Sequence, residues 1–273
     1  MQIFISADIE GVAGVMRPEQ CSSSHAEYHI ARGLMEREVN AAIEGAFLGG
    51  ASGVTVADSH GQMTNLRAEN LDCRARLVQG KPRMLSMVEG VEHQRYDGML
   101  FIGYHSAAGE FGVLSHTING RAFWRVMING EVMGETDIYA AAGAEQGVPL
   151  LMVSGDDQLQ RWVAQRYPQT AFATVKRAIA HTTAESLSPQ AAQDLIRETV
   201  RQALKTACPP ATRHIAPPYR LVLQASRPVL ADLFALVPGV AREDGMTVSY
   251  QAAAMHDIIR LLSVFSYLAT TQS

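Results

Sequence analysis

Ile3-Phe-Ile-Ser-Ala7 and Gly53-Val-Thr-Val-Ala-Asp58 are short apolar stretches, and each predicts a β-strand. Between them, residues 27–48 carry apolar side chains at near-helical spacing, and Gly49-Gly50 ends the predicted helix. A strand–helix–strand order of this kind predicts a parallel βαβ unit. Further strands are predicted at 77–79, 98–103 and 148–154, and the last two lack the alternation of a half-exposed strand. We therefore predict an α/β fold with a mostly parallel open sheet and helices on both of its faces.

The C-terminal part has a different pattern and predicts a smaller α+β lobe. Ser188-Pro189 is an N-cap followed by proline at the first helical position. Residues 208–218 contain four prolines and predict a long loop. One strand (221–224), a helix (229–236), a hairpin turning at Asp244-Gly245 and a closing helix (252–268) follow. We expect a domain at 1–170 that carries the functional site, and a C-terminal lobe at 171–273.

A hairpin is predicted inside the first of these domains. Residues 124–133 are two short strands joined by Asn129-Gly130, a pair typical of a type I′ turn. The hairpin leads to Glu135 and to an alanine-rich helix predicted at 136–145.

Composition excludes several classes of protein. The net charge of −4 and the isoelectric point near 6.1 argue against nucleic acid as a partner. The three cysteines form no CxxC pair, so we expect neither a disulfide framework nor a thiolate zinc site. The first apolar run ends at Asp8, too early for a signal peptide, and no stretch approaches the roughly 20 apolar residues of a membrane helix. We expect a cytoplasmic protein with no membrane partner.

Five potential metal ligands lie at the ends of predicted strands or at the start of a predicted helix. They are Asp8, Glu10, His60, His105 and Glu135. Asp8 and Glu10 are two residues apart, so both point to one side of an extended chain, where they would repel each other without a cation. The carboxyl ends of parallel strands meet at one edge of a sheet. Each residue alone also has a structural explanation, but the joint pattern predicts a two-metal hydrolytic centre.

Imidazole and carboxylate ligands without a thiolate suit zinc, and also manganese, cobalt or iron. Asp8 is the natural bridge between two ions that activate water and polarise a carbonyl. His116 follows His105 by eleven residues across a loop with two glycines, and we interpret it as a catalytic group rather than a sixth ligand. A histidine satisfied within a turn is the alternative. Asp58 either orients His60 or caps the turn after the strand, and for Asp156 we favour a helix cap.

Seven motifs in this order resemble a known family. They are Ser-Ala-Asp-Ile-Glu-Gly-Val-Ala-Gly from residue 6, Ala-Asp-Ser-His-Gly-Gln-Met-Thr-Asn-Leu from 57, Ser-Met-Val-Glu-Gly from 86, Gly-Tyr-His from 103, Gly-Val-Leu-Ser-His-Thr from 112, Ile-Asn-Gly with Gly-Glu from 128 and 134, and Met-Val-Ser-Gly-Asp-Asp from 152. The chain resembles the D-aminopeptidases of the DppA type, peptidase family M55, densely up to about residue 160 and loosely beyond it.

The resemblance implies a cytoplasmic zinc metallo-aminopeptidase with two Zn²⁺ per subunit, held by the five ligands above. It implies a homo-oligomer, a ring-stacked homodecamer, that removes N-terminal D-residues from short peptides such as D-Ala-D-Ala. It also implies a catalytic His116, which the family account treats as nucleophile. Chemical reasoning instead assigns the attack to water activated by metal, and leaves proton transfer or charge stabilisation to His116. The family usually has Asn four residues after the Gly-Glu glutamate, whereas this chain has Tyr139.

Three alternatives remain open from sequence. The same metallo-aminopeptidase chemistry with L- or broad specificity is the first, because Tyr139 departs from the family pattern. A metal-free acid–base pair of Asp8 and Glu10 is weak, because two neighbours on one strand do not straddle a scissile bond. A non-catalytic, metal-stabilised binding protein is the third, although structural metal sites are usually closed and rich in cysteine.

Overall fold

The computed structural model describes residues 1–205 and 213–272. Its elements, with η for 3₁₀-helices, begin with β1 (Gln2–Ala7), α1 (Pro18–Cys21), α2 (Tyr28–Leu48), β2 (Gly53–Asp58), η1 (Ala68–Asn70), β3 (Ala75–Val78), η2 (Ser86–Val88), β4 (Gly98–Ile102), β5 (Phe123–Ile128), β6 (Glu131–Val132) and α3 (Glu135–Glu145). They continue with β7 (Leu150–Asp156), α4 (Asp157–Arg166), β8 (Ala171–Ala180), β9 (Thr183–Ser186), α5 (Pro189–Lys205), β10 (Tyr219–Ala225), α6 (Pro228–Phe234), β11 (Ala241–Arg242), β12 (Thr247–Ala252), α7 (Met255–Ala269) and η3 (Thr270–Gln272).

A seven-stranded sheet in the order β3-β2-β1-β4-β7-β8-β9 forms the larger part of the molecule. All of its neighbouring strands pair in parallel except β8 and β9, which form an antiparallel edge. The predicted βαβ unit is confirmed, because β1 and β2 are parallel neighbours and α2 connects them. The mostly parallel α/β fold is therefore confirmed.

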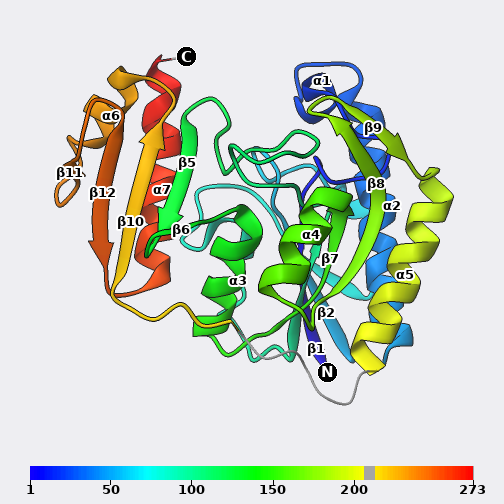
Figure 1. The fold of residues 1–273 in the computed structure, drawn as a ribbon. Coiled ribbons are helices and arrows are strands. Elements are labelled where there is room, and N and C mark those ends of the chain that lie inside the picture. Colours follow the sequence, from blue (N-terminus) through cyan, green and yellow to red (C-terminus); the bar gives the residue numbers. More distant parts are fainter. Residues whose placement is uncertain (206–212, 273) are drawn as a thin grey trace.

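Successive side chains of β1 point to opposite faces of this sheet and join two different cores. Ile3 and Ile5 pack with residues of α2 and α5, whereas Phe4 belongs to the core shared with the second sheet. Both faces of the large sheet are thus buried, which explains why β4 and the first part of β7 are continuous apolar runs. In Figure 1, α2 and α5 lie along one side of the large sheet, and α3 and α4 lie on the side toward the small sheet.

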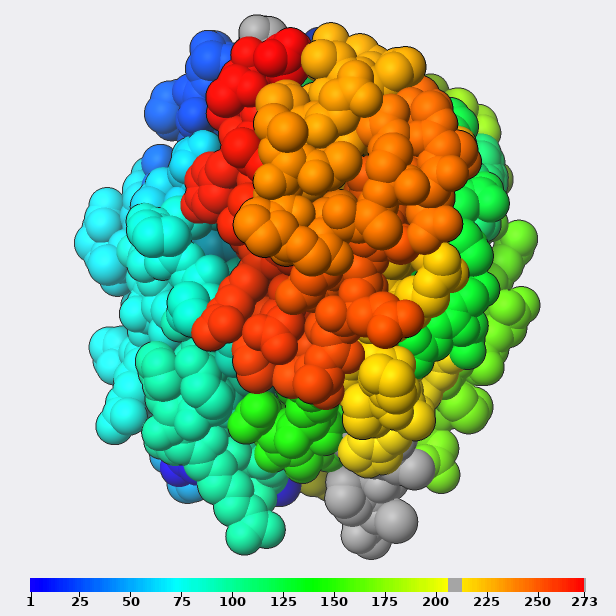
Figure 2. Space-filling model, turned by 90° about the vertical axis from the view of Figure 1, so that its left-hand side faces the viewer, coloured from blue at the N-terminus to red at the C-terminus, as the bar shows by residue number. Residues whose placement is uncertain are grey.

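The second sheet is antiparallel, in the order β11-β12-β10-β5-β6. The predicted hairpin is confirmed as β5 and β6, and its turn residues Asn129 and Gly130 have φ of 53° and 83°, as a type I′ turn requires. Helix α7 packs against this sheet and also contacts α3 and η2. Figure 2 shows this C-terminal part, in orange and red, on one face of the molecule. It lies beside the cyan and turquoise part of the chain between β2 and β4.

The expected division at residue 171 does not coincide with the division between the two sheets. Strand β8 begins at Ala171 and pairs with β7 in the large sheet, while β5 and β6 come from the first half of the chain and complete the small sheet. The reason is that a strand pairs with whichever strand edge is exposed beside it, and this edge can come from a distant part of the chain. Residues 208–212 of the predicted proline-rich loop lie outside the described residues. Within 1–205 and 213–272, no helix combines the length and hydrophobicity that crossing a membrane requires.

Candidate metal centre

The carboxyl ends of three adjacent strands bring the predicted ligands together. Ala7, the last residue of β1, is paired with Asp58 at the end of β2 and with Ile102 at the end of β4. The chain therefore leaves all three strands at the same level. Asp8 and Glu10 follow β1, His60 follows β2 and His105 follows β4. Glu135 is the first residue of α3 and points toward the same edge.

These side chains form one compact, buried cluster. His60 Nδ1 lies 3.1 Å from Asp8 Oδ1 and 3.0 Å from Glu10 Oε2. His105 Nε2 lies 3.3 Å from Asp8 Oδ2 and 3.5 Å from Glu135 Oε2. Asp8 thus stands between the two imidazoles, with one oxygen toward each. The three carboxylates are at most 5% exposed.

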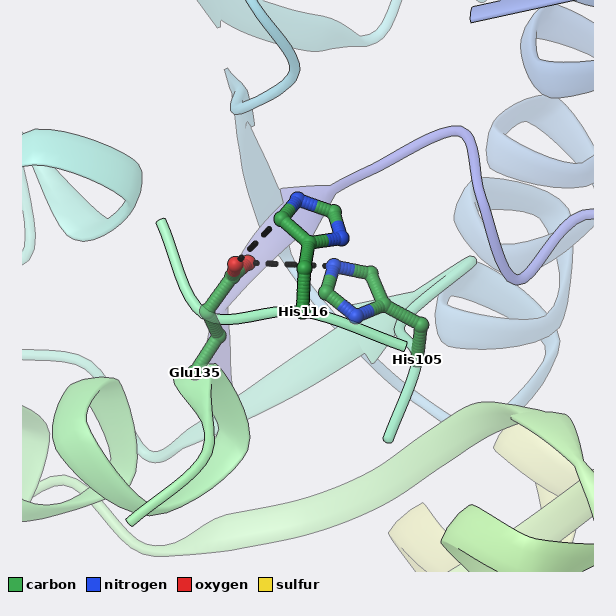
Figure 3. Close-up of side chains that lie close together, drawn as sticks. All are labelled: His105, His116 and Glu135. Carbon is green, nitrogen blue, oxygen red and sulfur yellow. Dashed lines mark ion pairs between the residues drawn. The ribbon is translucent and has the colours of Figure 1, made fainter. Parts of the chain in front are cut away.

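His116 joins the cluster from the loop after β4. Its ring stacks on that of His105, with centroids 4.1 Å apart and planes inclined by 10°. Its Nε2 lies 3.8 Å from Glu135 Oε1. Figure 3 marks this ion pair with a dashed line. Within this cluster, candidate ligand atoms that lie within 4.8 Å of one another form two groups, one of Asp8, Glu10 and His105 and one of His105, His116 and Glu135; His60 is in neither group. The structure therefore also places His116 within reach of a metal.

Backbone carbonyls fix the tautomers of the two predicted histidine ligands. His60 Nε2 lies 2.7 Å from the Cys21 carbonyl, and His105 Nδ1 lies 3.0 Å from the Ser106 carbonyl. Because a carbonyl oxygen only accepts, each of these nitrogens must donate. The other nitrogen of each ring is then an acceptor that faces carboxylate oxygens. Acceptors at such distances repel unless a proton or a cation lies between them.

The electrostatics of the cluster reflect the same conflict. Burial and the Glu10 carboxylate raise the pKa of Asp8. Burial also tends to raise the pKa of Glu10, but the positive charge of His60 outweighs it and holds that pKa well below its usual value. Burial acts against protonation of His60 and His105, yet the carboxylates raise the pKa of both well above the usual value. Protonation of these two imidazoles would offset part of the charge of the three buried carboxylates.

Donor chemistry fits divalent cations at this position. Glu10 Oε2 and His105 Nε2 are buried and make no hydrogen bond of regular geometry within the described part of the chain, although each lies within 3.5 Å of another candidate ligand. Buried polar atoms of native proteins normally have a partner. Metal-bound histidines usually donate their second N–H to a carbonyl or a carboxylate, as both rings do here. Oxygen and imidazole donors without thiolate suit zinc among other divalent ions.

Two further aspartates at strand ends cap a turn and a helix. The Asp58 carboxylate accepts from the backbone N–H of Leu66 at 2.7 Å and from the Asn65 side chain at 2.7 Å, so it caps the turn rather than contacting the His60 ring. Asp156 accepts from the N–H groups of Gln158 and Leu159, which confirms the predicted helix cap.

Two loop residues on either side of His116 have unusual backbone conformations. Leu114 and Ile118 adopt φ of 53° and 61°, which β-branched and bulky residues seldom do. The bend aims the Ile118 N–H at Glu135 Oε1, at 2.6 Å. Such strain is often found at functional sites. The sequence did not predict the role of the Ile118 backbone N–H, because every residue except proline has such a group.

Two cavities meet the cluster. One of about 750 Å³ is lined by Glu10, His60, His116 and Trp124 among others. A second of about 400 Å³ is lined by Asp8, Glu135, His116 and Tyr139. The Tyr139 hydroxyl bonds Ser86 Oγ at 3.1 Å, so its ring is fixed beside the carboxylates. His116 lines both cavities, so each offers space for a small ligand beside this residue.

A mostly parallel α/β fold with a buried carboxylate–imidazole cluster at its strand ends is typical of a metal-dependent enzyme, and comparisons with known proteins identify its family. The profile of the peptidase M55 family, described as D-aminopeptidase, matches residues 1–264. A D-aminopeptidase from Bacillus subtilis (strain 168) is 33% identical over 285 residues, which cover 100% of this chain and 99% of the relative. The chain belongs to the D-aminopeptidase family M55, and it is a peptidase.

A solved structure extends the similarity to three dimensions. It is described as the Zn-dependent D-aminopeptidase DppA from Bacillus subtilis, a self-compartmentalizing protease. The two chains superpose with a TM-score of 0.95 at 31% identity, over 99% of this chain and 98% of the other. The resemblance found in the sequence motifs therefore extends over the whole chain.

Proposed function

We propose that this protein is a zinc aminopeptidase that binds two Zn²⁺ ions and removes the N-terminal residue from short D-amino-acid peptides such as D-Ala-D-Ala. The main support for metal binding is the orientation of His60 and His105, whose acceptor nitrogens face buried carboxylates. Family membership and the zinc-dependent relative support the choice of metal and reaction. Asp8, Glu10, His60, His105 and Glu135 would hold the ions.

When bound, the ions supply Lewis acidity that polarises a peptide carbonyl and acidifies water. The protein's own residues orient the substrate and move protons. Three carboxylates and two Zn²⁺ would leave the centre without net negative charge, so these carboxylates would act as ligands rather than as a binding site for an ammonium group. The proposed preference for a free N-terminus rests on family membership.

His116 has the geometry of a proton-transfer group. Its Nδ1 lies 2.8 Å from the Leu114 carbonyl, so Nδ1 donates there and Nε2 is the basic nitrogen. Nε2 lies near Glu135 Oε1, and the ring lines both cavities. In this position Nε2 is able to take a proton from water and give it to the leaving amine. Ring stacking on His105 holds the imidazole in place.

Self-assembly and location complete the proposal. The relative described as self-compartmentalizing supports a homo-oligomer, and we propose a homodecamer that encloses its active sites. A cytoplasmic location stays a prediction.

Cleavage of blocked and free peptides tests the proposed reaction. We expect hydrolysis of D-Ala-D-Ala and of D-Ala-D-Ala-D-Ala from the N-terminus, and none of N-acetyl-D-Ala-D-Ala. L-Ala-L-Ala is the matched control for configuration. Equal cleavage of the acetylated peptide would rule out an aminopeptidase, and preference for the L-peptide would overturn only the proposed substrate.

A further inference from the structure

Lys176 is a buried cation that the chemistry of the centre does not use directly. It lies on β8 and is only 3% exposed. Its ammonium group donates to the backbone carbonyls of Glu10, Val12 and Val15, the second at 3.0 Å. An ammonium group has three protons, so all of them are used on one short segment. That segment begins with a predicted metal ligand.

The same segment receives its remaining bonds from other distant elements. The Gly11 N–H donates to the Gly103 carbonyl at 2.7 Å. The Ala13 N–H donates to Glu38 Oε1 at 2.9 Å, and the Gly14 N–H donates to Ser186 Oγ at 2.9 Å. Residues 9–15 form neither a long helix nor a strand, so their buried polar groups depend on such partners. Lys176 thus donates to backbone carbonyls of this segment, and Glu38 and Ser186 accept from its backbone N–H groups.

Packing alone does not account for a lysine at this position. Its neighbours Val175 and Ala178 on β8 fill the core with apolar side chains. Burial of an ammonium group is costly unless hydrogen bonds compensate. The hydrogen bonds that compensate come from the segment that carries Glu10, which is 166 residues away in the chain. The charges of Asp156 and Glu38 also favour the ammonium form.

We propose that Lys176 is a positioning residue that holds the backbone of Glu10 and thereby sets the place of its carboxylate in the metal centre. The inference rests on the proposed function, because it takes Glu10 as a ligand. The Glu10 carbonyl is bound to Lys176 while its Oε2 lies 3.0 Å from His60 Nδ1. A shift of this backbone would therefore move Glu10 relative to Asp8 and His105, which follow β1 and β4.

Lys176→Met with Arg177→Met as matched control tests the proposal. Arg177 is the next residue on the same strand, but its side chain is exposed and pairs with Glu185. We expect Lys176→Met to weaken zinc affinity by about 10–100-fold, the usual range when a group behind a ligand is lost. Chelator competition measures that affinity without turnover. The Co²⁺-substituted variant should also show an altered d–d absorption spectrum, and kcat should fall more than KM changes. Arg177→Met should match wild type in every measurement.

Lys176→Gln is a second, more conservative variant, which keeps the proposal testable if Lys176→Met does not fold. It retains two N–H donors without the charge, so we expect an intermediate loss of zinc affinity. Thermal unfolding of the metal-free proteins shows whether each variant is folded at the assay temperature. A folded Lys176→Met or Lys176→Gln protein with wild-type zinc affinity and an unchanged Co²⁺ spectrum would refute the positioning role. A wild-type protein that binds no divalent metal would refute the proposed function, and this inference with it.

Discussion

Glu38 offers a prediction whose size follows from the structure. It lies on α2, is 2% exposed, and accepts from the Ala13 N–H with one carboxylate oxygen. Its other oxygen has no hydrogen-bond partner within the described residues. Burial is the main cause that raises the pKa of Glu38 from 4.5 to about 7, against the opposing effects of the Ala13 amide and Lys176. The folded protein therefore holds a proton here at pH values where the unfolded chain has released it.

The sign and the size of the pH dependence follow by linkage. A pKa raised in the folded state gives stability that is full below pH 4.5 and is lost as the pH rises through about 7. With these two values, the contribution of Glu38 to the free energy of unfolding falls by roughly 2.5 kcal/mol between pH 5 and pH 8. Glu38→Gln keeps an oxygen for the Ala13 N–H and has no charge to titrate.

Chemical denaturation at several pH values measures the effect. From pH 5 to pH 8, the unfolding free energy of Glu38→Gln should rise relative to that of wild type by about 2 to 3 kcal/mol. Glu44→Gln is the control, because it removes a carboxylate from the exposed side of the same helix, where Glu44 pairs with Arg197. A constant difference between Glu38→Gln and wild type across this range would refute the reasoning.

The remaining predictions concern the centre itself. His60→Ala and Glu135→Ala should each abolish metal retention and turnover, measured by elemental analysis and D-Ala-D-Ala hydrolysis; a variant with full metal content would remove that residue from the ligand set. His116→Ala should retain the metal and lower kcat by about 10²–10⁴-fold, the usual contribution of a proton-transfer group. Full activity in that variant would exclude His116 from the mechanism, and loss of metal would make it a ligand. Tyr139→Asn should change the kcat/KM ratio of D-Ala to D-Leu substrates by about 10-fold or more, since small volume changes in a pocket have effects of that order. An unchanged ratio would separate Tyr139 from substrate selection.

The parallel sheet and the convergence of the predicted ligands could be predicted because both depend on local signals. Apolar runs mark β1, β2 and β4, and polar residues follow each of them. Parallel pairing then places the strand ends together without further information. Asp8, His60 and His105 meet for this reason.

The rest depends on contacts that no local pattern encodes. Lys176 and Glu38 lie in a strand and a helix that also carry other charged residues, and sequence alone suggests exposed positions for both. Only the tertiary structure brings them to the segment after β1. The assignment of β5 and β8 to their sheets likewise depends on which strand edges are free. The Ile118 amide is directed by a positive φ that its side chain disfavours.

Metal content and metal-dependent turnover, determined on one preparation, test the central claim most directly. The protein is assayed as purified, after chelation and after zinc is restored, with matched D-Ala and L-Ala p-nitroanilides. We predict close to two zinc ions per chain, loss of D-Ala cleavage on chelation and its return with zinc. Cleavage that persists at full rate in the chelated, metal-free protein would contradict the account, because the orientation of His60 and His105 would then have no catalytic meaning.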